Sequence, residues 1–225
     1  MGDTNEREIE WKTSKLPEET KAALDFFAKQ EWLKSSSWYL AGGTALSMYA
    51  GHRISFDVDF FLPEAVFSSS SLIANLPKEI WISDIVKEDT VYGRLGGAKV
   101  SFIANSLFVP KQNPHWYGNI RVLDIKDIAV MKIVAVSQRG KRRDFIDLYW
   151  YSTHEEPLLE VIKKLQVQYP SVAHDYHHIL KSLTYFADAE EDPMPQLFFE
   201  VDWQKIKKYF KEEAALAAKN LNLLL

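Results

Sequence analysis

The chain has 225 residues, 47% of them hydrophobic, which is enough for one medium domain, or one domain with a helical extension, and a core of its own. It contains no cysteine, which excludes disulfides, thiolate zinc sites and cysteine nucleophiles and fits a reducing cytoplasm. Because its formal net charge is -4, any nucleic acid must be bound by a local basic patch and not by the overall field.

The N-terminal segment predicts a packing helix. The run from Leu16 to Leu33 carries apolar residues at helical spacing, with Pro17 in a first-turn position. The first ten residues, MGDTNEREIE, are polar and acidic and lack the basic and apolar regions of a secretory signal. No apolar run in the chain is long enough to span a bilayer. We therefore expect a cytoplasmic protein with no membrane partner.

A strand, a glycine turn and a helix are expected between residues 38 and 51. The apolar run 38–41 ends at Gly42 and Gly43, so a strand stops there and the chain turns with its amides free to approach a ligand. A helix then begins near Thr44 and ends at Gly51. Its N-terminal amides and dipole favour a triphosphate, and the Thr44 hydroxyl caps the helix, bonds a phosphate oxygen, or does both. The alternative is an ordinary strand-to-helix turn with a capping threonine.

Two aspartates follow on the next expected strand, residues 55–62. Residues there alternate and then become apolar, as in a core strand, so Asp57 and Asp59 share one face. Two neighbouring carboxylates repel each other and lose hydration, and a hard cation such as Mg²⁺ compensates both effects. Asp57 and Asp59 are therefore candidate magnesium ligands and catalytic residues. The alternative is that both acids simply face water at a strand edge.

The segment after the aspartates indicates more strands. Runs 80–86, 90–95 and 99–103 have the composition of three successive strands, the last two joined by a turn at Gly96-Gly97. Residues 105–119 hold two prolines and scattered aromatics, so we expect an irregular loop there, followed by a short strand at 120–123. Together these runs predict a mixed sheet.

Helices dominate the sequence from Asp124 onward. A first helix begins with Asp124 or Asp127 as its N-cap and breaks near Gly140. Lys132 lies on or beside its apolar face, an unusual position for a lysine. Further amphipathic helices are expected over 155–168, 172–186 and 202–220.

The helix expected over residues 142–151 carries two acids among apolar residues. Because apolar side chains surround nearly all of its surface, this helix should be buried. Asp144 and Asp147 share a face one turn apart. Buried acids need a partner, and Lys132 is the best candidate in the sequence.

The order of these features resembles a known enzyme superfamily. A glycine turn, a short helix and then Asp-x-Asp on the next strand resemble the signature of the nucleotidyltransferase (DNA polymerase β-like) superfamily. Within it, LAGGTALSMYAGHRISFDVDFF is similar to the AbiEii/AbiGii toxin family, which includes abortive-infection toxins and the MenT toxins. The later stretch DIKDIAVMKIVAVSQRGKRRDFIDLYW is similar to that family's motifs with a helical Lys and a paired-Asp helix. The resemblance spans about residues 16–150.

The resemblance implies roles for these residues. Asp57 and Asp59 would hold Mg²⁺ ions that bridge the triphosphate, and Lys132 would contact phosphate or the developing charge. Either Asp144 or Asp147 would orient that lysine or help with metal or acceptor. The other interpretation is a structural buried ion pair that joins two helices.

The basic residues near these motifs have two possible interpretations. The densest cluster consists of Arg139, Lys141, Arg142 and Arg143, and Arg53 precedes the aspartate pair. As functional residues they would bind the triphosphate or the backbone of an RNA acceptor. Otherwise the cluster is a solvated turn between helices, and for Arg53 a surface turn position is favoured.

One position departs from the superfamily pattern. Many nucleotidyltransferases place a third catalytic carboxylate on a later strand, and the corresponding position here is Ser101. A serine cannot supply the charge that a second metal requires. Either one ion suffices, or Asp144 or Asp147 substitutes, or activity is weak or lost.

These observations predict an α/β (α+β) protein. A small mixed nucleotidyltransferase sheet with flanking helices, residues 1–123, would precede a mostly helical lobe, residues 124–225, with the nucleotide between them. By resemblance, the reaction moves a nucleoside monophosphate from an NTP to a hydroxyl of tRNA or a protein, in the toxin of a toxin–antitoxin or phage-defence system with a cognate antitoxin. Two alternatives stay open. One is a degenerate nucleotide- or partner-binding protein, and the other is an antibiotic-type nucleotidyltransferase with an acidic pocket from Asp84, Glu88 and Asp89.

Overall fold

Within residues 9–220, the part of the chain that the computed structural model describes, seven strands form one mixed sheet. The strands are β1 (Tyr39–Ala41), β2 (Val58–Leu62), β3 (Trp81–Val86), β4 (Thr90–Leu95), β5 (Ala98–Ala104), β6 (His115–Tyr117) and β7 (Ile120–Val122). Their order is β3-β4-β5-β2-β1-β7-β6. The pairs β2–β5 and β1–β7 are parallel and the other pairs are antiparallel, so the predicted mixed sheet is confirmed.

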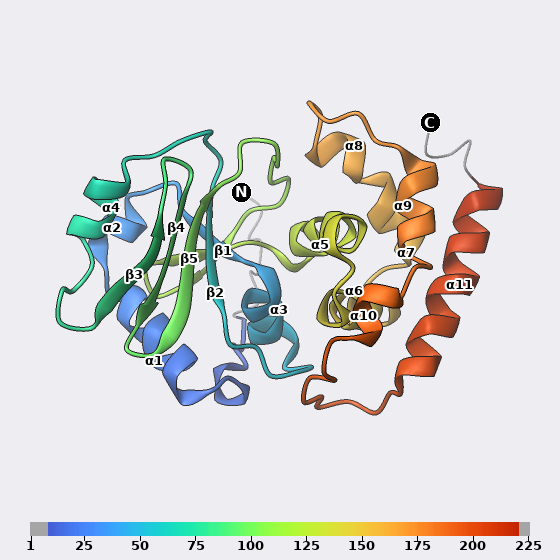
Figure 1. Ribbon diagram of the computed structural model, residues 1–225, viewed down its shortest axis with the longest axis horizontal. Helices are drawn as coiled ribbons and strands as arrows, with labels where there is room; N and C mark the ends of the chain where they lie inside the picture. Colours follow the sequence, from blue (N-terminus) through green and yellow to red (C-terminus); the bar gives the residue numbers. More distant parts are fainter. Residues whose placement is uncertain (1–8, 221–225) are drawn as a thin grey trace, which may run out of the picture.

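The helices lie around and after this sheet (Figure 1). Before β7 they are the 3-10 turn η1 (Thr13–Lys15), α1 (Glu18–Phe27), α2 (Glu31–Lys34), α3 (Gly42–Ala50) and α4 (Ser69–Ala74). After β7 they are α5 (Ile125–Arg139), α6 (Arg142–His154), α7 (Leu158–Lys163), α8 (Leu165–Gln168), α9 (Tyr176–Ser182), α10 (Ala187–Glu190) and α11 (Trp203–Lys219). The described chain after Asp124 is therefore mostly helical, as the sequence predicted.

Three sequence predictions of local structure were wrong. The single helix expected over 155–168 is divided into α7 and α8. The single helix expected over 16–33 is divided into α1 and α2, because the carbonyl of Ala28 accepts a hydrogen bond from Asn119 N (2.7 Å) and leaves the helical ladder. The loop expected over 105–119 contains β6, which pairs with β7 through a turn at Gly118, where φ is +56°. Pro110 and Pro114 concealed the strand signal in the sequence.

The sheet has two different faces. On one face α1 packs its Phe27 ring against Phe60 and Phe102, whose rings stack 5.0 Å apart. Residues of the opposite face, including Asp59, Phe61 and Ser101, line a cavity that α5 also lines. Figure 1 shows α3 between the sheet and the helices α5 and α6. The core is continuous from the strands into α5 and α6, so a domain boundary at 123/124 stays a prediction.

A late segment of the chain fixes the loop that precedes the aspartates. Arg53 forms an isolated antiparallel bridge with Leu197. Phe198 N donates to the His52 carbonyl (2.8 Å), and Ile54 N donates to the Gln196 carbonyl (3.0 Å). The residues between α3 and β2 are thus held from both halves of the chain.

Among the described helices, none combines the length and the apolar character needed to cross a bilayer. The prediction about a secretory signal rests largely on residues 1–8, which, like 221–225, lie outside the described residues.

Gly93 of β4 provides a test of the sheet packing. A Cβ there would lie 2.4 Å from the Trp81 ring and 2.5 Å from the Ile82 carbonyl oxygen. Because neither neighbour can withdraw freely, we expect Gly93→Ala to lower the free energy of unfolding by about 1–3 kcal/mol in urea titrations. Arg94→Ala, which removes an exposed ion pair with Asp84, should cost at most about 1 kcal/mol. Equal losses in the two variants would contradict this packing.

Candidate active site

The glycine pair after β1 is required by the side chains packed over it. Gly42 has φ of +74°, and a Cβ there would lie 3.0 Å from Asp59 Oδ2. A Cβ on Gly43 would lie 2.4 Å from Arg53 Nη2. Only glycine allows the carboxylate and the guanidinium to approach the start of α3 so closely. Both glycines line the cavity.

Thr44 has neither of the uses predicted for its hydroxyl. The helix begins at Gly42, and its N-cap residue, Ala41, provides no side-chain cap. The hydroxyl of Thr44 is buried, hydrogen-bonds the carbonyl oxygen of Asp57 and lies 3.0 Å from Ser55 Oγ. Thr44 also does not line the cavity. It therefore fixes the backbone at the aspartate pair instead of capping α3 or facing a phosphate.

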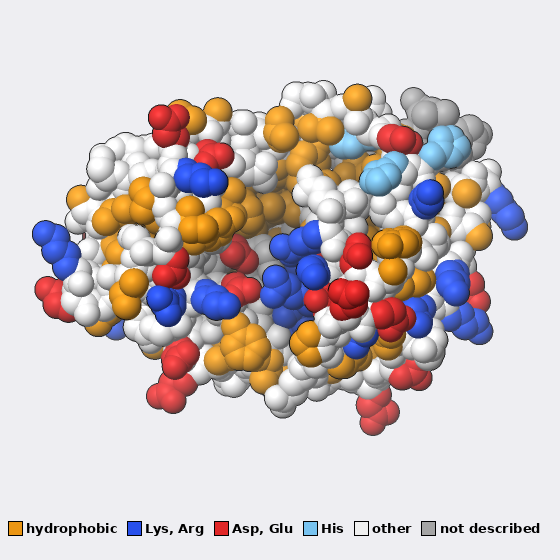
Figure 2. Space-filling model, in the orientation of Figure 1, with side chains coloured by type: hydrophobic (Ala, Val, Ile, Leu, Met, Phe, Trp, Pro, Cys, Tyr) orange, Lys and Arg blue, Asp and Glu red, His pale blue; other side chains and the backbone are white. Residues whose placement is uncertain are grey.

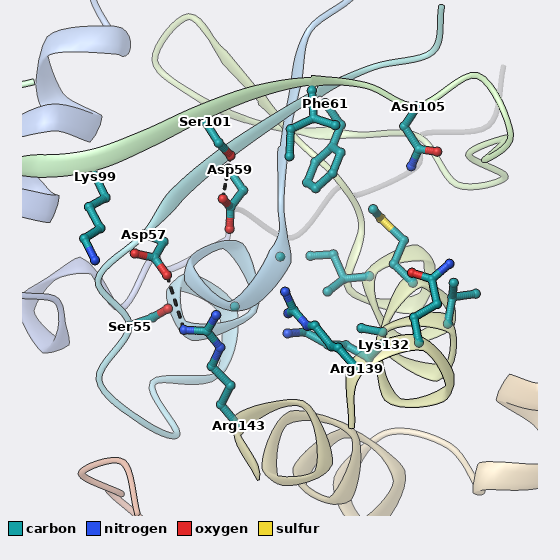
Figure 3. Close-up of a pocket in the computed structure, with 18 of the residues that line it drawn as sticks. Ser55, Asp57, Asp59, Phe61, Lys99, Ser101, Asn105, Lys132, Arg139 and Arg143 are labelled. Atoms are coloured by element: carbon teal, nitrogen blue, oxygen red, sulfur yellow. Dashed lines mark hydrogen bonds and ion pairs between the residues drawn. The ribbon is translucent and has the colours of Figure 1, made fainter. Parts of the chain in front are cut away.

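Asp57 and Asp59 both line the cavity, as their shared face predicted. Asp59 lies on β2 in register with Ser101 of β5, and Ser101 Oγ donates to Asp59 Oδ1 over 2.6 Å (Figure 3). Asp57 directly precedes β2, and its Oδ2 lies 3.3 Å from Arg143 Nη1. Burial, with a contribution from Asp57, raises the pKa of Asp59 against the hydrogen bond from Ser101. Two acids in this setting favour a nearby cation.

The donor set of this pair fits Mg²⁺. Carboxylate oxygens are its preferred protein ligands, and it commonly uses one or two of them together with substrate phosphates and water. Within residues 9–220, no group of three or more His, Asp and Glu side chains is placed to hold a metal ion. Ser101 occupies the expected position of a third carboxylate, and Asp144 and Asp147 do not replace it because neither lines the cavity. Phosphate and water would have to complete the coordination of a metal ion.

Asp147 is the centre of a buried ion network. Its Oδ1 accepts from Arg53 Nε (2.6 Å) and lies 2.7 Å from His52 Nε2. Its Oδ2 accepts from Arg53 Nη2 (2.7 Å) and pairs with Lys132 Nζ (2.6 Å). Burial alone would raise the pKa of Asp147, but Arg53 and Lys132 outweigh it and hold that pKa well below its usual range. The carboxylate is therefore fully charged and fully paired.

Asp144 forms the second part of the network, one turn away on α6. It accepts from Lys132 Nζ (2.9 Å) and from Arg139 through Nε (2.8 Å) and Nη2 (3.0 Å). Lys132, only 4% exposed, is held between the two aspartates, while both Lys132 and Arg139 line the cavity. The sequence correctly paired Lys132 with these acids. The acids themselves hold the cations in place and have no surface in the cavity.

Arg53 is buried, so the prediction that favoured a surface turn position for it was wrong. It is 3% exposed, donates to Asp147 through Nε and Nη2, and donates to the Ile54 carbonyl through Nη1. Its Nη2 lies over Gly43 and the residue lines the cavity. Sequence reasoning missed this pairing because the arginine and its carboxylate are 94 residues apart in the chain.

The basic cluster is divided between two tasks. Arg139 and Arg143 line the cavity, as Figure 3 shows. Lys141 instead pairs with Asp192 (3.2 Å), and Arg142 donates to the Ala189 carbonyl (2.8 Å). The first two residues can meet a ligand, and the other two hold the segment around α10.

Several cavity residues were missed by sequence reasoning. Lys99 lines the cavity two residues before Ser101 on β5, and the two-residue strand period could have placed it there. Ser55, Asn105 and Gln138 also line it, and no local pattern marks them. Of the acids proposed for an antibiotic-type pocket, Asp84 lines the cavity but pairs with Arg94 (3.0 Å), and Glu88 and Asp89 do not line it. These positions do not favour that alternative.

The cavity has a volume of about 570 Å³, within the usual range for small-molecule sites. Figure 2 shows a hollow in this face with acidic side chains inside it and Lys and Arg gathered along the helical wall. The charged lining residues are Arg53, Asp57, Asp59, Asp84, Lys99, Lys132, Arg139 and Arg143. Carboxylates on the sheet thus face cations on α5 and α6 across one space.

Solved structures share this architecture. A proposed nucleotidyltransferase from H. pylori has a TM-score of 0.51 and 19% sequence identity, and the likeness covers 91% of this chain and 96% of that one. MenT4, a nucleotidyltransferase toxin from Mycobacterium tuberculosis H37Rv, has a TM-score of 0.50 and 14% identity, covering 90% of this chain and 86% of that one. The fold is therefore a nucleotidyltransferase fold.

Sequence comparisons identify the family. A family model described as "Nucleotidyl transferase AbiEii toxin, Type IV TA system" matches residues 31–95 and 98–220. Uncharacterized protein aq_aa25 of Aquifex aeolicus (strain VF5) is 36% identical over 185 residues, covering 79% of this chain and 86% of the relative. The chain belongs to the AbiEii nucleotidyltransferase toxin family.

Removing the central charge of the network should be costly. Asp147→Asn keeps the shape of the side chain but leaves Arg53 and Lys132 without their shared counter-charge, so we expect the free energy of unfolding to fall by about 3–5 kcal/mol. The control, Asp84→Asn, breaks an exposed pair and should cost at most about 1 kcal/mol. Urea titrations measure both, and a loss below about 1 kcal/mol for Asp147→Asn would contradict the network's structural role.

His52 gives the network a pH signature. Burial lowers the pKa of His52 against the opposing effect of Asp147, and its Nδ1 has no hydrogen-bond partner in the described structure. The unfolded chain therefore binds a proton at His52 that the folded chain does not, so stability should fall as pH drops below about 6.5. Asp144 and Asp147, whose pKa values are lowered on folding, add a further loss below about pH 4.

The His52→Gln variant isolates the first of these effects. Glutamine can still donate to Asp147 but does not titrate, so thermal unfolding midpoints between pH 6.5 and 4.5 should decline less in this variant than in the wild type. Identical slopes in the two proteins would show that His52 is not the group responsible.

Proposed function

We propose that this chain transfers a nucleoside monophosphate from an NTP to a hydroxyl group and releases pyrophosphate. The observation that carries the proposal is an opposition across one cavity: Asp57 just before β2 and Asp59 on β2 face Lys132, Arg139 and Arg143 on the helices. A triphosphate is the common biological ligand that requires both a divalent cation and several basic side chains. Membership of a nucleotidyltransferase family supports the same reaction class.

The cations retain donors that a triphosphate can use. Arg53 uses three of its five N–H groups, two on Asp147 and one on the Ile54 carbonyl, so one remains on Nη1 and one on Nη2, the nitrogen beside Gly43. Lys132 donates one of its three N–H groups to Asp144 and forms an ion pair with Asp147, and Arg139 uses two of its five N–H groups. Because the acids fix these side chains before a ligand arrives, little rotamer entropy is lost on binding.

Asp57 and Asp59 are the residues that would hold Mg²⁺. Bound there, the ion would supply charge neutralisation at the α-phosphate and the leaving pyrophosphate. Ser101 holds Asp59 Oδ1 through its hydroxyl, which leaves Oδ2 directed toward Gly42 at the start of α3. Arg143 neutralises Asp57 in the present structure and is 48% exposed, so it is free to move from the carboxylate to a phosphate.

In the reaction, the acceptor hydroxyl oxygen would bond to the α-phosphorus while the bond to the bridging oxygen of pyrophosphate breaks, and the hydroxyl proton would leave to solvent. The acceptor proposed is a tRNA end or a protein hydroxyl. We further propose that the chain acts in the cytoplasm as the toxin of a toxin–antitoxin or phage-defence system and binds a cognate antitoxin. Support for the toxin role comes from the family description and from the likeness to MenT4.

A second candidate is a nucleotide-binding protein without turnover. Ser101 in place of a third carboxylate favours it, because two acids give less charge for metal ions than three.

Label transfer distinguishes the two candidates. Purified protein would be incubated with each α-labelled NTP, Mg²⁺, total tRNA and cell lysate, beside the variants Asp57→Asn and Asp59→Asn. We expect label on one acceptor with the intact protein and at least about a 100-fold lower rate in either variant, because each removes a metal ligand. Asp89→Asn, the same change at an exposed acid that does not line the cavity, serves as the matched control and should retain the rate to within about threefold.

Each result has a clear reading. Transfer lost in both variants and kept in the control supports the transferase. NTP binding without any transfer supports the binding protein and contradicts the reaction proposed above.

A further inference from the structure

The part of the cavity away from Asp57 has a different chemistry. Figure 3 shows Phe61 and Asn105 to the right of Asp57 and Lys99, with Lys132 and Arg139 below Phe61. Apolar side chains of Phe61, Leu107, Met131 and Val134 contribute to the lining, together with the amides of Asn105 and Gln138. The cavity therefore combines a charged portion with a neutral one.

Helix α5 separates these two chemistries by its own geometry. At 100° per residue, Lys132 and Arg139 lie within about 20° of each other on the helix surface. Met131 and Gln138, also seven residues apart, form a parallel stripe turned by about 100°. One side of α5 thus presents charge to the cavity, and the adjacent side presents a thioether and an amide.

The two amides have unused hydrogen-bonding capacity. Within residues 9–220, neither the Asn105 nor the Gln138 side chain has a hydrogen-bond partner in the protein, although both line the cavity. Each amide offers an acceptor oxygen and two N–H donors without charge. Such groups match the mixed donor and acceptor edges of nucleobases better than phosphate, for which the cations are better partners.

The loop that carries Asn105 and Leu107 is fixed to its surroundings. Asn105 N donates to the Leu62 carbonyl, and Val109 N donates to the Gln168 carbonyl, each over 2.7 Å. Farther along, Asp127 Oδ2 accepts from the backbone N–H groups of Lys111 (2.9 Å) and Gln112 (3.0 Å). Leu107 is nevertheless 52% exposed, so the loop presents an apolar side chain at a site held open in advance.

We propose that this neutral portion is the nucleobase subsite of the NTP, and that Asn105 and Gln138 determine which base is accepted. The proposal rests on the proposed function for the triphosphate. The apolar side chains would pack against the flat faces of the base, while the amides pair with its edge. A site built to hydrogen-bond a ligand discriminates strongly against one that leaves its polar groups unpaired, so the four NTPs should bind unequally.

Calorimetry with Mg²⁺ tests the subsite without requiring turnover. The ligands are the four NTPs and ribose 5′-triphosphate, which lacks a base. We expect the wild type to bind its preferred NTP at least about tenfold more tightly than its poorest NTP and than ribose triphosphate. Asn105→Leu and Gln138→Met keep the size of the side chain and remove its hydrogen bonding. In each variant the spread of dissociation constants among the four NTPs should fall to about threefold or less, and the affinity for ribose triphosphate should not change.

The control variant is Gln204→Met. Gln204 is an exposed residue of α11 that does not line the cavity, so the same chemical change there should leave the spread intact. Circular dichroism melts would establish that all three variants fold. The backbone at Asn105 has no positive φ, so leucine introduces no conformational strain.

The outcomes separate this inference from the proposed function. Tight NTP binding with an unchanged spread in Asn105→Leu and Gln138→Met overturns the subsite, whether or not label is transferred. Ribose triphosphate binding as tightly as every NTP overturns it as well. The wild type could instead transfer no label and yet prefer one base, with that preference abolished by the two substitutions. This result overturns the transferase alone and supports the subsite.

Discussion

The buried carboxylate of Asp147 is the interaction on which the arrangement of this protein depends. It binds Arg53 and His52 from the loop after α3 and Lys132 from α5, so it joins the strand-rich and helical halves of the chain. Burying so many charges carries a large desolvation cost, and only complete pairing offsets it. The network therefore specifies one relative placement of α3, α5 and α6, since displacement of any of them leaves a buried charge without a partner.

That placement assembles the cavity. Arg53 is held over Gly43, while the Thr44 hydroxyl fixes the backbone of Asp57. Lys132 and Arg139 are held by acids behind them and face the carboxylates of the sheet across the open space. A single ion network thus gives the protein both a joint between its halves and a set of preorganised cations, which is the property that binding of a triphosphate requires.

Local patterns in the sequence predicted much of this and missed what depends on distant contacts. The glycine turn, the shared face of Asp57 and Asp59 and most strands follow from spacing alone, and the pairing of Lys132 with Asp144 and Asp147 follows from helix periodicity. The burial of Arg53 did not follow, because its carboxylate is 94 residues away. The inward hydrogen bond of Thr44 and the division of the basic cluster likewise depend on neighbours that meet only in the folded chain. Strand β6 was missed for a local reason, the nearby prolines Pro110 and Pro114.

The most direct test of this account is a crystal structure of the protein with Mg²⁺ and an NTP analogue that cannot be cleaved between its α- and β-phosphates. The account predicts the triphosphate between the start of α3 and the side chains of Lys132 and Arg139, with Arg143 released from Asp57 and the Asp147 network unchanged. A nucleotide bound outside this cavity, or bound inside it with the triphosphate away from these cations, would contradict the central claim.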